Sequence, residues 1–217
     1  HMKKVSIEKI FGSEPKEIMR LLRSSGKECY IVGGAIRDLL LGYEKPIDID
    51  LTTSLSVEKM KRMFDQNKIR FDDRALKYGC LTISNQKKRT FQITSFRKDI
   101  QTFGRAADIE PVENIEEDAK RRDFTINAFY CSYDGQIIDP LGNLEDLNKI
   151  KLDFIGDPEI RIKEDYLRIL RFFRFIAVLD LKDENLVSKN LPIIRKHIDG
   201  ISDLSYERVA SEIRKIL

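Results

Sequence analysis

A strand, a helix and a second strand are predicted within residues 31–52, which read IVGGAIRDLLLGYEKPIDIDLT. The apolar run before Gly33 is typical of a buried strand, and the AIRDLLL segment that follows is typical of a short helix. The second strand carries Asp48 and Asp50, and residues two apart in a strand point to the same face of the sheet. The segment therefore predicts two neighbouring carboxylates beside a glycine turn, while the alternating apolar residues pack into a core.

Two carboxylates on one strand face repel each other, and a cation between them is the usual solution. Asp48 and Asp50 offer the oxygen ligands that Mg²⁺ prefers together with phosphate oxygens. Gly33 and Gly34 have no side chains, so phosphate oxygens can approach their N–H groups where the next helix begins. A pair of solvated aspartates and a plain tight turn are the alternatives. Together with Arg37, the pattern favours a site for a metal-bound triphosphate.

Length, net charge and the few cysteines and histidines bear on the kinds of protein and of catalytic site that are possible. The chain has 217 residues, enough to bury a sizeable core, and a net charge of +3, which neither demands nor excludes a polyanionic partner. Cys29, Cys80 and Cys131 are far apart, which predicts reduced thiols and a reducing cytoplasm. With His1 interpreted as a cloning remnant, His197 is the only histidine left, which excludes histidine triads and histidine zinc sites. No apolar run is long enough to cross a membrane.

Hydrophobic spacing predicts an α/β head followed by a helical extension. Strand patterns dominate up to about residue 139, and the chain after about residue 159 is predicted to be wholly helical. The segment 97–114 has no clear period, so we expect a mobile loop there. The expected strands are 29–32, 47–51, 80–84 and 90–96, with a further hairpin in 129–139. The expected helices of the head are 16–24, 35–41, one capped by Ser56, and 115–120.

A further helix is predicted around residues 164–177. Arg168, Arg171 and Glu164 are expected on its polar side, with Asp165 one turn before Arg168. One interpretation is a salt bridge between Asp165 and Arg168 on a solvated face, worth about 0.2–0.5 kcal/mol. The expected core stripe consists of Ile169, Leu170, Phe173, Ile176 and Ala177.

Five motifs, in order along the chain, resemble the signatures of one enzyme family. The segment GGAIRDLLLGYEKPIDIDLT resembles the first signature of the class II tRNA nucleotidyltransferases and bacterial poly(A) polymerases, a branch of the DNA polymerase β-like nucleotidyltransferases. Its glycines, its Arg-Asp pair and its DxD motif have the family spacing. The other resembling segments are EEDAKRRDFTINAFY (116–130), DPLGNLEDL (139–147), RIKEDYLRILRFFRF (161–175) and LSYERVASEIRKIL (204–217).

The resemblance implies an α+β protein in two parts. Residues 1–142 would form a polymerase β-like nucleotidyltransferase head, with a mixed sheet and helices, that carries the catalytic residues. Residues 143–217 would form an all-α neck that recognises the base and begins an RNA-binding helical region. Full-length relatives continue through further helices that hold tRNA, so we expect a C-terminally truncated chain or a short chain that needs a partner.

A carboxylate and a guanidinium together can read the pairing edge of a base. Cytosine and adenine present an amino donor beside a ring-nitrogen acceptor, whereas guanine and uracil present the reverse order. A carboxylate accepts from the amino group and a guanidinium donates to the ring nitrogen, so the pair would admit C and A. Each mismatch leaves desolvated polar groups unpaired, at a cost of about 1–3 kcal/mol apiece. The resemblance implies this role for Asp165 and Arg168, supported by Arg171.

The motif KRRDFTINA can be interpreted as a solvated basic turn, but the resemblance implies that it grips the sugar and the triphosphate. Its polar groups would detect the ribose 2′-OH. Asp48 and Asp50 are the expected catalytic metal ligands. The expected nucleotide-binding residues are Gly33, Gly34, Arg37, Arg122, Asp123, Asn127, Asp165, Arg168 and Arg171.

Gln92 departs from the family pattern, which usually has a third metal-site carboxylate on the strand before a Thr-Phe-Arg-like element. A neutral amide ligates weakly and adds no negative charge. Three accounts compete: the two aspartates suffice, the substitution was engineered, or activity is reduced.

The residues favour metal-dependent triphosphate chemistry, and the resemblance implies an enzyme that adds CMP and AMP from CTP and ATP to a tRNA 3′ end without a template, forming the CCA terminus with Mg²⁺ as cofactor. One metal ion would lower the pKa of the primer 3′-hydroxyl, and another would clamp the triphosphate and the leaving pyrophosphate. A CC-adding or A-adding specialist and a poly(A) polymerase are alternatives with the same chemistry. A non-catalytic RNA- or nucleotide-binding module with a degenerate metal site is the alternative from another class. The sequence makes no prediction of oligomeric state.

Overall fold

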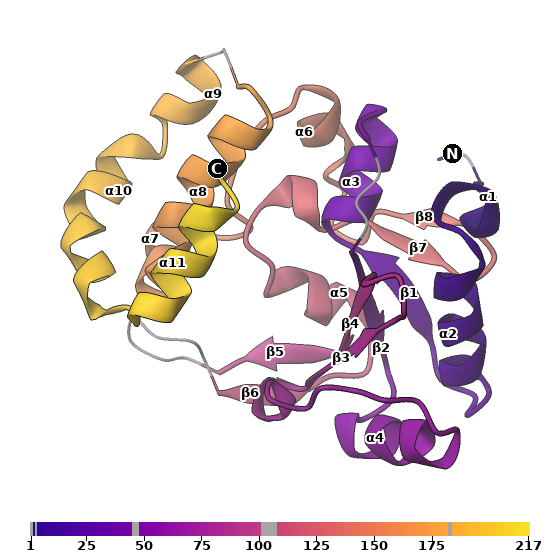
Figure 1. The fold of residues 1–217 in the computed structure, drawn as a ribbon. Helices are drawn as coiled ribbons and strands as arrows, with labels where there is room; N and C mark the ends of the chain where they lie inside the picture. Colours follow the sequence, from indigo (N-terminus) through magenta and orange to yellow (C-terminus); the bar gives the residue numbers. More distant parts are fainter. Residues whose placement is uncertain (1, 3, 45–47, 101–107, 182–183) are drawn as a thin grey trace.

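The computed structural model describes the chain apart from residues 1, 3, 45–47, 101–107 and 182–183. A mixed sheet with its helices forms one part of the molecule, and helices α7 to α11 form the other (Figure 1). This architecture confirms the expected α+β class. In the part of the chain described, no helix combines the length and the apolar character needed to cross a bilayer.

The six-stranded sheet has the order β3-β4-β2-β1-β7-β8. Strands β2 and β4 pair in parallel, and the other neighbouring strands pair antiparallel. Strand β2 extends two residues beyond the expected end because its pairing with β1 and β4 continues through Thr53. Ile47, its expected first residue, lies outside the described residues. The strands are β1 (Cys29–Val32), β2 (Ile49–Thr53), β3 (Cys80–Ser84), β4 (Thr90–Ser95), β7 (Tyr130–Ser132) and β8 (Ile137–Ile138).

Capping side chains and glycines fix the helices around this sheet. The hydroxyl of Ser56 accepts a hydrogen bond from the N–H of Lys59, as its predicted capping role requires. Gly42 ends α3 in the left-handed region, with φ +73°, where glycine carries no steric penalty. The helices before residue 158 are α1 (Ile7–Phe11), α2 (Ser13–Arg23), α3 (Gly34–Leu41), α4 (Val57–Gln66), α5 (Ile115–Lys120) and α6 (Leu144–Asn148).

The expectation of an irregular loop across 97–114 is wrong for both of its ends. Strand β5 (Arg97–Asp99) pairs antiparallel with β6 (Ile109–Pro111). An ion pair of 3.3 Å between Lys98 and Glu110 joins the two strands. The sequence pattern does not reveal these strands, because charged residues predominate in them and neither strand has a buried residue. Residues 101–107 lie outside the described residues.

The second part contains only helices among its described elements from residue 158 onward, as predicted. The helix expected around residues 164–177 is wrong at its start, because α7 ends at Glu164 and Asp165 has an extended backbone. The Asp165 side chain accepts from the N–H of Leu167 at 3.1 Å, so the short acid competes with helical bonding. The helices are α7 (Pro158–Glu164), α8 (Leu167–Val178), α9 (Glu184–Ser188), α10 (Leu191–His197) and α11 (Tyr206–Arg214).

An aromatic cluster joins the two parts. The ring centroids of Phe124 and Phe154 lie 4.9 Å apart, and those of Phe154 and Phe172 lie 5.9 Å apart. Helix α8 buries Ile169, as expected, but it also buries Phe172 and Phe175 and leaves Phe173 40% exposed, so the expected core stripe is wrong for Phe173. The same core runs through both parts, and the boundary expected at residues 142 and 143 stays a prediction.

Candidate active site

Asp48 and Asp50 lie at the start of β2, close to the end of β1. Asp50 pairs in register with Val32 of β1 and with Gln92 of β4, so the side chains of Asp50 and Gln92 project from the same face of the sheet. Asp48 precedes β2 and accepts a hydrogen bond from the N–H of Thr90 at 3.0 Å. Both aspartates are exposed, so a ligand can reach them.

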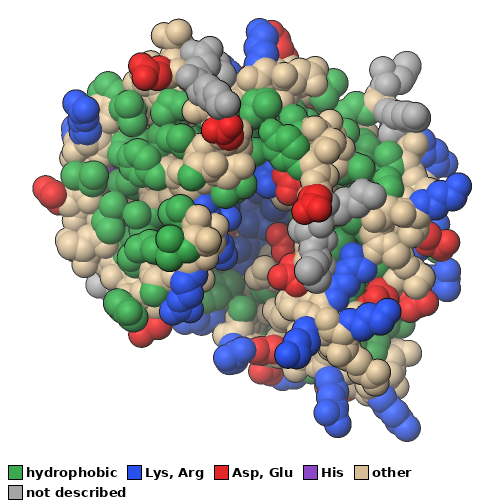
Figure 2. Space-filling model, turned by 45° about the horizontal axis from the view of Figure 1, so that its top comes forward, with side chains coloured by type: hydrophobic (Ala, Val, Ile, Leu, Met, Phe, Trp, Pro, Cys, Tyr) green, Lys and Arg blue, Asp and Glu red, His purple; other side chains and the backbone are tan. Residues whose placement is uncertain are grey.

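Protein atoms surround the Asp50 carboxylate although solvent reaches it. This desolvation is the largest influence on Asp50 and raises its pKa, and Asp48 adds to the rise. Arg122, Arg171 and Lys215 act in the opposite direction. Because these cations come from both parts of the molecule, the carboxylate faces the junction between the head and the helical part. Figure 2 shows a hollow on one face of the molecule, with Lys and Arg side chains lining it and Asp and Glu side chains beside it.

The donor atoms around Asp50 fit a hard divalent cation. A cation would relieve the repulsion by which Asp48 raises the pKa of Asp50. The amide of Gln92 adds a neutral oxygen on the same face. In the described ranges, no group of three or more His, Cys, Asp or Glu side chains could hold a metal ion. Two carboxylates are nevertheless enough for Mg²⁺, which keeps several waters and takes substrate phosphate oxygens.

The predicted glycine turn lies directly beside this carboxylate. Gly33 caps α3 with φ +76° and ψ −137°, a backbone conformation that other residues rarely adopt. A Cβ at Gly33 would lie 3.9 Å from Oδ2 of Asp50. A Cβ at Gly34 would lie 3.3 Å from Nη2 of Arg37. The two glycines therefore leave the backbone open beside one acid and one guanidinium.

Arg37, Asn127, Asp123 and Arg171 form one continuous network, although they come from three separate segments. Nη1 of Arg37 donates to Oδ1 of Asn127 at 2.7 Å, and Nδ2 of Asn127 donates to Oδ1 of Asp123 at 3.1 Å. Nε of Arg171 donates to Oδ2 of Asp123 at 2.6 Å. Burial alone would raise the pKa of Asp123, but Arg171 and Asn127 lower it to about 2. Four predicted site residues are thus brought together around an ionised aspartate.

Arg122 binds a different carboxylate, that of Asp118. Its Nη2 donates to Oδ2 of Asp118 at 3.0 Å, and its Nε donates to the hydroxyl of Tyr130 at 2.9 Å. Arg121 donates to the other oxygen of Asp118 at 3.0 Å. Asp118 is completely buried and was not among the predicted residues. Its spacing of three and four residues from two arginines that directly follow α5 was the available signal.

Asp165 and Arg168 do not pair with each other through their side chains. Arg168 is only 8% exposed, so the interpretation of a solvated face is wrong for it. Its Nη1 donates to Oε2 of Glu164 at 2.8 Å and to the carbonyl oxygen of Arg161 at 2.7 Å. The carboxylate of Asp165 accepts instead from Arg208, which the sequence reasoning missed. The two predicted residues nevertheless line one small pocket, together with Asp99, Ile100 and Glu164.

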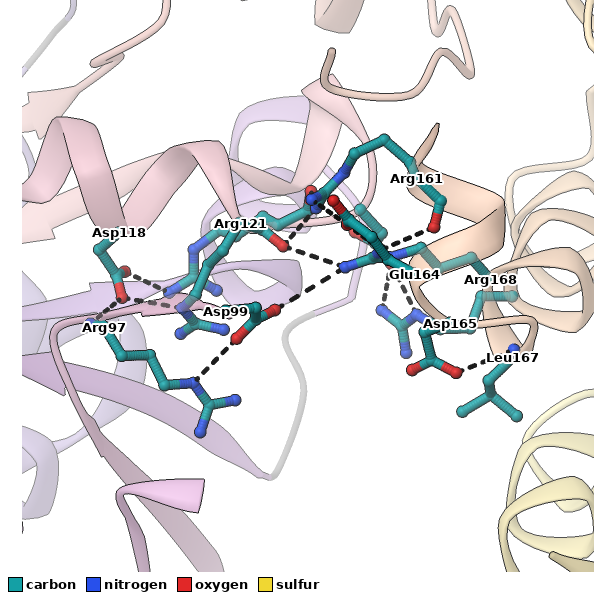
Figure 3. A network of polar contacts seen from close by, with 12 residues as sticks. Arg97, Asp99, Asp118, Arg121, Arg161, Glu164, Asp165, Leu167 and Arg168 are labelled. Carbon is teal, nitrogen blue, oxygen red and sulfur yellow. Dashed lines mark hydrogen bonds and ion pairs between the residues drawn. The ribbon is translucent and has the colours of Figure 1, made fainter. Parts of the chain in front are cut away.

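Further ion pairs connect this pocket to the head (Figure 3). Nη2 of Arg168 lies 3.8 Å from one oxygen of Asp99, and Nε of Arg97 lies 3.8 Å from the other. Nη2 of Arg161 donates to the carbonyl oxygens of Arg121 and of the next residue, at 2.5 and 2.7 Å. These contacts hold α7 and α8 against α5 and β5.

Glu212 of α11 anchors a second set of cations that sequence reasoning missed. It is only 2% exposed and pairs with Arg174. Its oxygens also lie 3.9 Å from Nη1 of Arg171 and 3.8 Å from Nζ of Lys215. Burial lowers the pKa of Lys215, which also interacts electrostatically with Asp50. Lys215, directly after α11, therefore contributes positive charge that acts on Asp50.

Residues 29–153 match the family model of the poly A polymerase head domain. This match covers more than half of the chain, so the chain belongs to this family of nucleotidyltransferase heads. The resemblance found in the motifs is confirmed.

Several relatives of the chain are named CCA-adding enzymes or tRNA nucleotidyltransferases. The chain is 38% identical over 209 residues to the mitochondrial CCA tRNA nucleotidyltransferase 1 of Homo sapiens, covering 96% of this chain and 48% of that protein. The crystal structure of the Bacillus stearothermophilus CCA-adding enzyme in complex with CTP superimposes with a TM-score of 0.74 and 32% identity, over 94% of this chain and 48% of that chain. A tRNA nucleotidyltransferase complexed with a primer tRNA and an incoming ATP analog has a TM-score of 0.66 and 25% identity, over 91% and 55%. The chain spans about half the length of the relatives it matches.

Proposed function

We propose that the chain carries the catalytic site of a tRNA nucleotidyltransferase that adds CMP and AMP to tRNA 3′ ends, using CTP and ATP. The observation that carries the proposal is the position of Asp50. It pairs in register with Val32, directly before the glycine turn, and cations of the helical part act on it electrostatically. A triphosphate that reaches this carboxylate needs an open backbone on one side and positive charge on the other. The site supplies both.

Asp48 and Asp50 would hold one or two Mg²⁺ ions, which supply Lewis acidity toward the primer 3′-hydroxyl and the triphosphate. The turn at Gly33 keeps side-chain atoms away from the carboxylates, so phosphate oxygens can come close. Arg122 and Arg171 supply positive charge opposite Asp50. Each of these arginines is held by a buried aspartate, so its position is fixed before the nucleotide binds.

The base would be read in the pocket that Asp165 and Arg168 line. A carboxylate accepts from the amino group of cytosine or adenine, and a guanidinium donates to the adjacent ring nitrogen. Arg168 is fixed by Glu164 and by a backbone carbonyl, which restricts the directions in which it can donate. The complexes of related enzymes with CTP and with tRNA plus an ATP analog support this choice of substrates.

The three cysteines are free and buried, which supports a reducing compartment such as the cytoplasm.

Incorporation of labelled CTP, ATP, UTP and GTP into tRNAs that lack CCA, CA or A tests the proposal. The wild-type chain is expected to add C to the first two substrates and A to the third. Asp50→Asn should abolish incorporation, whereas Asp65→Asn, which removes an exposed acid from α4, should leave it unchanged. Equal activity of the wild type and the Asp50→Asn variant would contradict the proposal.

The same assay separates the alternatives. Addition restricted to C or to A would identify a specialist, and long runs of adenylate would identify a poly(A) polymerase. The neutral side chain of Gln92 beside Asp50 favours a non-catalytic nucleotide-binding module as the second candidate. Nucleotide binding without incorporation of any nucleotide, in the wild type and in Gln92→Glu alike, would select that module.

A further inference from the structure

Arg208 fills about half of the hydrogen-bonding capacity of the base-reading carboxylate. Its Nη1 donates to Oδ1 of Asp165 at 3.0 Å, and its Nη2 donates to Oδ2 at 2.6 Å. The N–H of Leu167 also donates to Oδ1, at 3.1 Å. A carboxylate offers roughly four acceptor positions, so three are filled. In the described part of the chain, Oδ2 accepts from Arg208 alone, which leaves one acceptor position on this oxygen.

The location of Arg208 carries an electrostatic cost that its pairing with Asp165 offsets. Ser205 caps α11 by accepting from the N–H of Arg208, so the guanidinium belongs to the first turn of this helix. A positive side chain in the first turn is disfavoured by the helix dipole. Both side chains are partly accessible, at 31% for Arg208 and 20% for Asp165. A base can therefore reach the pair, and the arginine has a partner that compensates its unfavourable place.

A guanidinium constrains the carboxylate in two ways. It stays charged and only donates, so it keeps Asp165 an acceptor. Its planar fork holds both oxygens at once, which fixes the plane of the carboxylate. Arg168 is held separately, by Glu164 and the carbonyl of Arg161. The two readers of the base are thus kept apart, each with its own partner.

We propose that Arg208 is a positioning residue for base selection: it holds Asp165 so that a single acceptor position, on Oδ2, faces the incoming base. One acceptor position fits the amino group of cytosine or adenine, whereas the carbonyl oxygen of uracil or guanine meets a second acceptor. Without Arg208, the carboxylate can turn toward Arg168, three residues along the chain. The two side chains would then bind each other instead of the base. This inference rests on the proposed nucleotidyl transfer and assigns selectivity to a helix outside the base pocket.

The test compares kcat/KM for CTP and for UTP on tRNA that lacks CCA, in the wild type and in Arg208→Ala. The ratio is expected to fall roughly tenfold to a hundredfold, mainly through a higher KM for CTP, because one oriented acceptor is lost. Arg208→Lys keeps the charge but loses the fork, so an intermediate ratio is expected. Arg214→Ala removes an exposed arginine from the same helix and should leave the ratio unchanged.

A double-mutant cycle with Asp165→Asn separates positioning from a purely structural role. In the Asp165→Asn background, Arg208→Ala is expected to add little further change to the CTP-to-UTP ratio. A structural role would instead lower the rates with all nucleotides alike and would add to the effect of Asp165→Asn. If Arg208→Ala does not fold, which thermal unfolding would reveal, Arg208→Gln and Arg208→Lys take its place in the cycle.

The outcomes for this inference and for the proposed function differ. A wild type that selects CTP, with an Arg208→Ala variant that selects it equally well, overturns the role of Arg208 and leaves nucleotidyl transfer intact. A wild type that incorporates CTP and UTP equally overturns the role of Arg208 and the expected choice of substrates but leaves nucleotidyl transfer intact. A wild type that incorporates neither overturns both. A wild type that selects CTP, with loss of selection in Arg208→Ala but not in Arg214→Ala, supports both.

Discussion

Gln92 lies directly beside Asp50, because β4 pairs in parallel with β2 in the register that aligns these two residues. Side chains of directly paired residues on neighbouring strands project from the same face. The amide therefore stands where a third carboxylate would contribute to a metal site. This is the position at which the sequence departs from the family pattern. Substitution of Gln92 alone therefore tests how the charge of the site affects metal binding.

Gln92→Glu is expected to lower the Mg²⁺ concentration that gives the half-maximal rate of CTP incorporation. The added carboxylate strengthens the attraction for a divalent cation, and a several-fold shift is expected from electrostatics near a protein surface. The maximal rate should change by less than about threefold if the two aspartates suffice. A Mg²⁺ titration of the wild type, Gln92→Glu and Thr82→Glu, which adds an acid one strand further away on β3, measures this. An equal shift in both variants would mean that Gln92 is not part of the metal site.

Gly33→Ala is expected to reduce both stability and activity. Its φ of +76° is in the region that disfavours a side chain, at a cost of about 1–3 kcal/mol. A backbone shift at this turn would also move Asp50, whose Oδ2 lies 3.9 Å from the position of the new Cβ. Gly42→Ala is the matched control, because Gly42 has φ +73° but open space around it.

Urea unfolding and CTP incorporation, measured on both glycine variants, separate the two effects. We expect similar losses in the free energy of unfolding, of about 1–2 kcal/mol for Gly42→Ala. Activity under folding conditions should fall at least tenfold in Gly33→Ala alone, because a small displacement of a metal ligand is enough for such a loss. Equal activity of the two variants would show that the turn at Gly33 serves the fold only.

Asp118 is expected to stabilise the folded chain at neutral pH and to lose this effect in acid. Burial alone would raise its pKa, but Arg121, Arg122 and the hydroxyl of Tyr130 lower it to about 2. A carboxyl group whose pKa is lower in the folded than in the unfolded chain stabilises the fold fully at pH values above its ordinary pKa. This stabilisation is lost as the pH falls toward 2. The contribution is about 2 kcal/mol by linkage.

Urea unfolding of the wild type and Asp118→Asn at pH 7, pH 4 and pH 2.5 measures this contribution. The variant should be less stable at pH 7 by about 3 kcal/mol, because two buried arginines lose their charged partner. The difference between the two proteins should shrink as the pH falls from 4 to 2.5. A difference that is independent of pH would contradict the role of the ionised carboxylate.

The local elements of the head could be predicted because their signals are short in range. Strand β1, helix α3 and the start of α4 follow from an apolar run, the AIRDLLL pattern and a capping serine. The two aspartates were recognisable because the period of a strand places them on one face. Such features need no knowledge of which segment lies next to which.

Features that depend on distant segments could not be predicted. The pairing of β5 with β6 joins charged strands on either side of residues 101–107. The partner of Asp165 is 43 residues away on another helix, whereas the sequence favoured Arg168, its neighbour three residues along. Phe172 and Phe175 of α8 are buried instead of Phe173, because they pack against Phe124 from the other part of the chain.

The binding of Mn²⁺ in the presence of CTP, followed by electron paramagnetic resonance, tests the central claim most directly, since it needs neither tRNA nor turnover. The wild-type chain should bind Mn²⁺ at a saturable site in complex with CTP. Asp48→Asn and Asp50→Asn should each weaken this binding at least tenfold, as loss of a charged ligand implies, whereas Asp65→Asn should not. Unchanged affinity for Mn²⁺ in Asp48→Asn and Asp50→Asn would contradict the account.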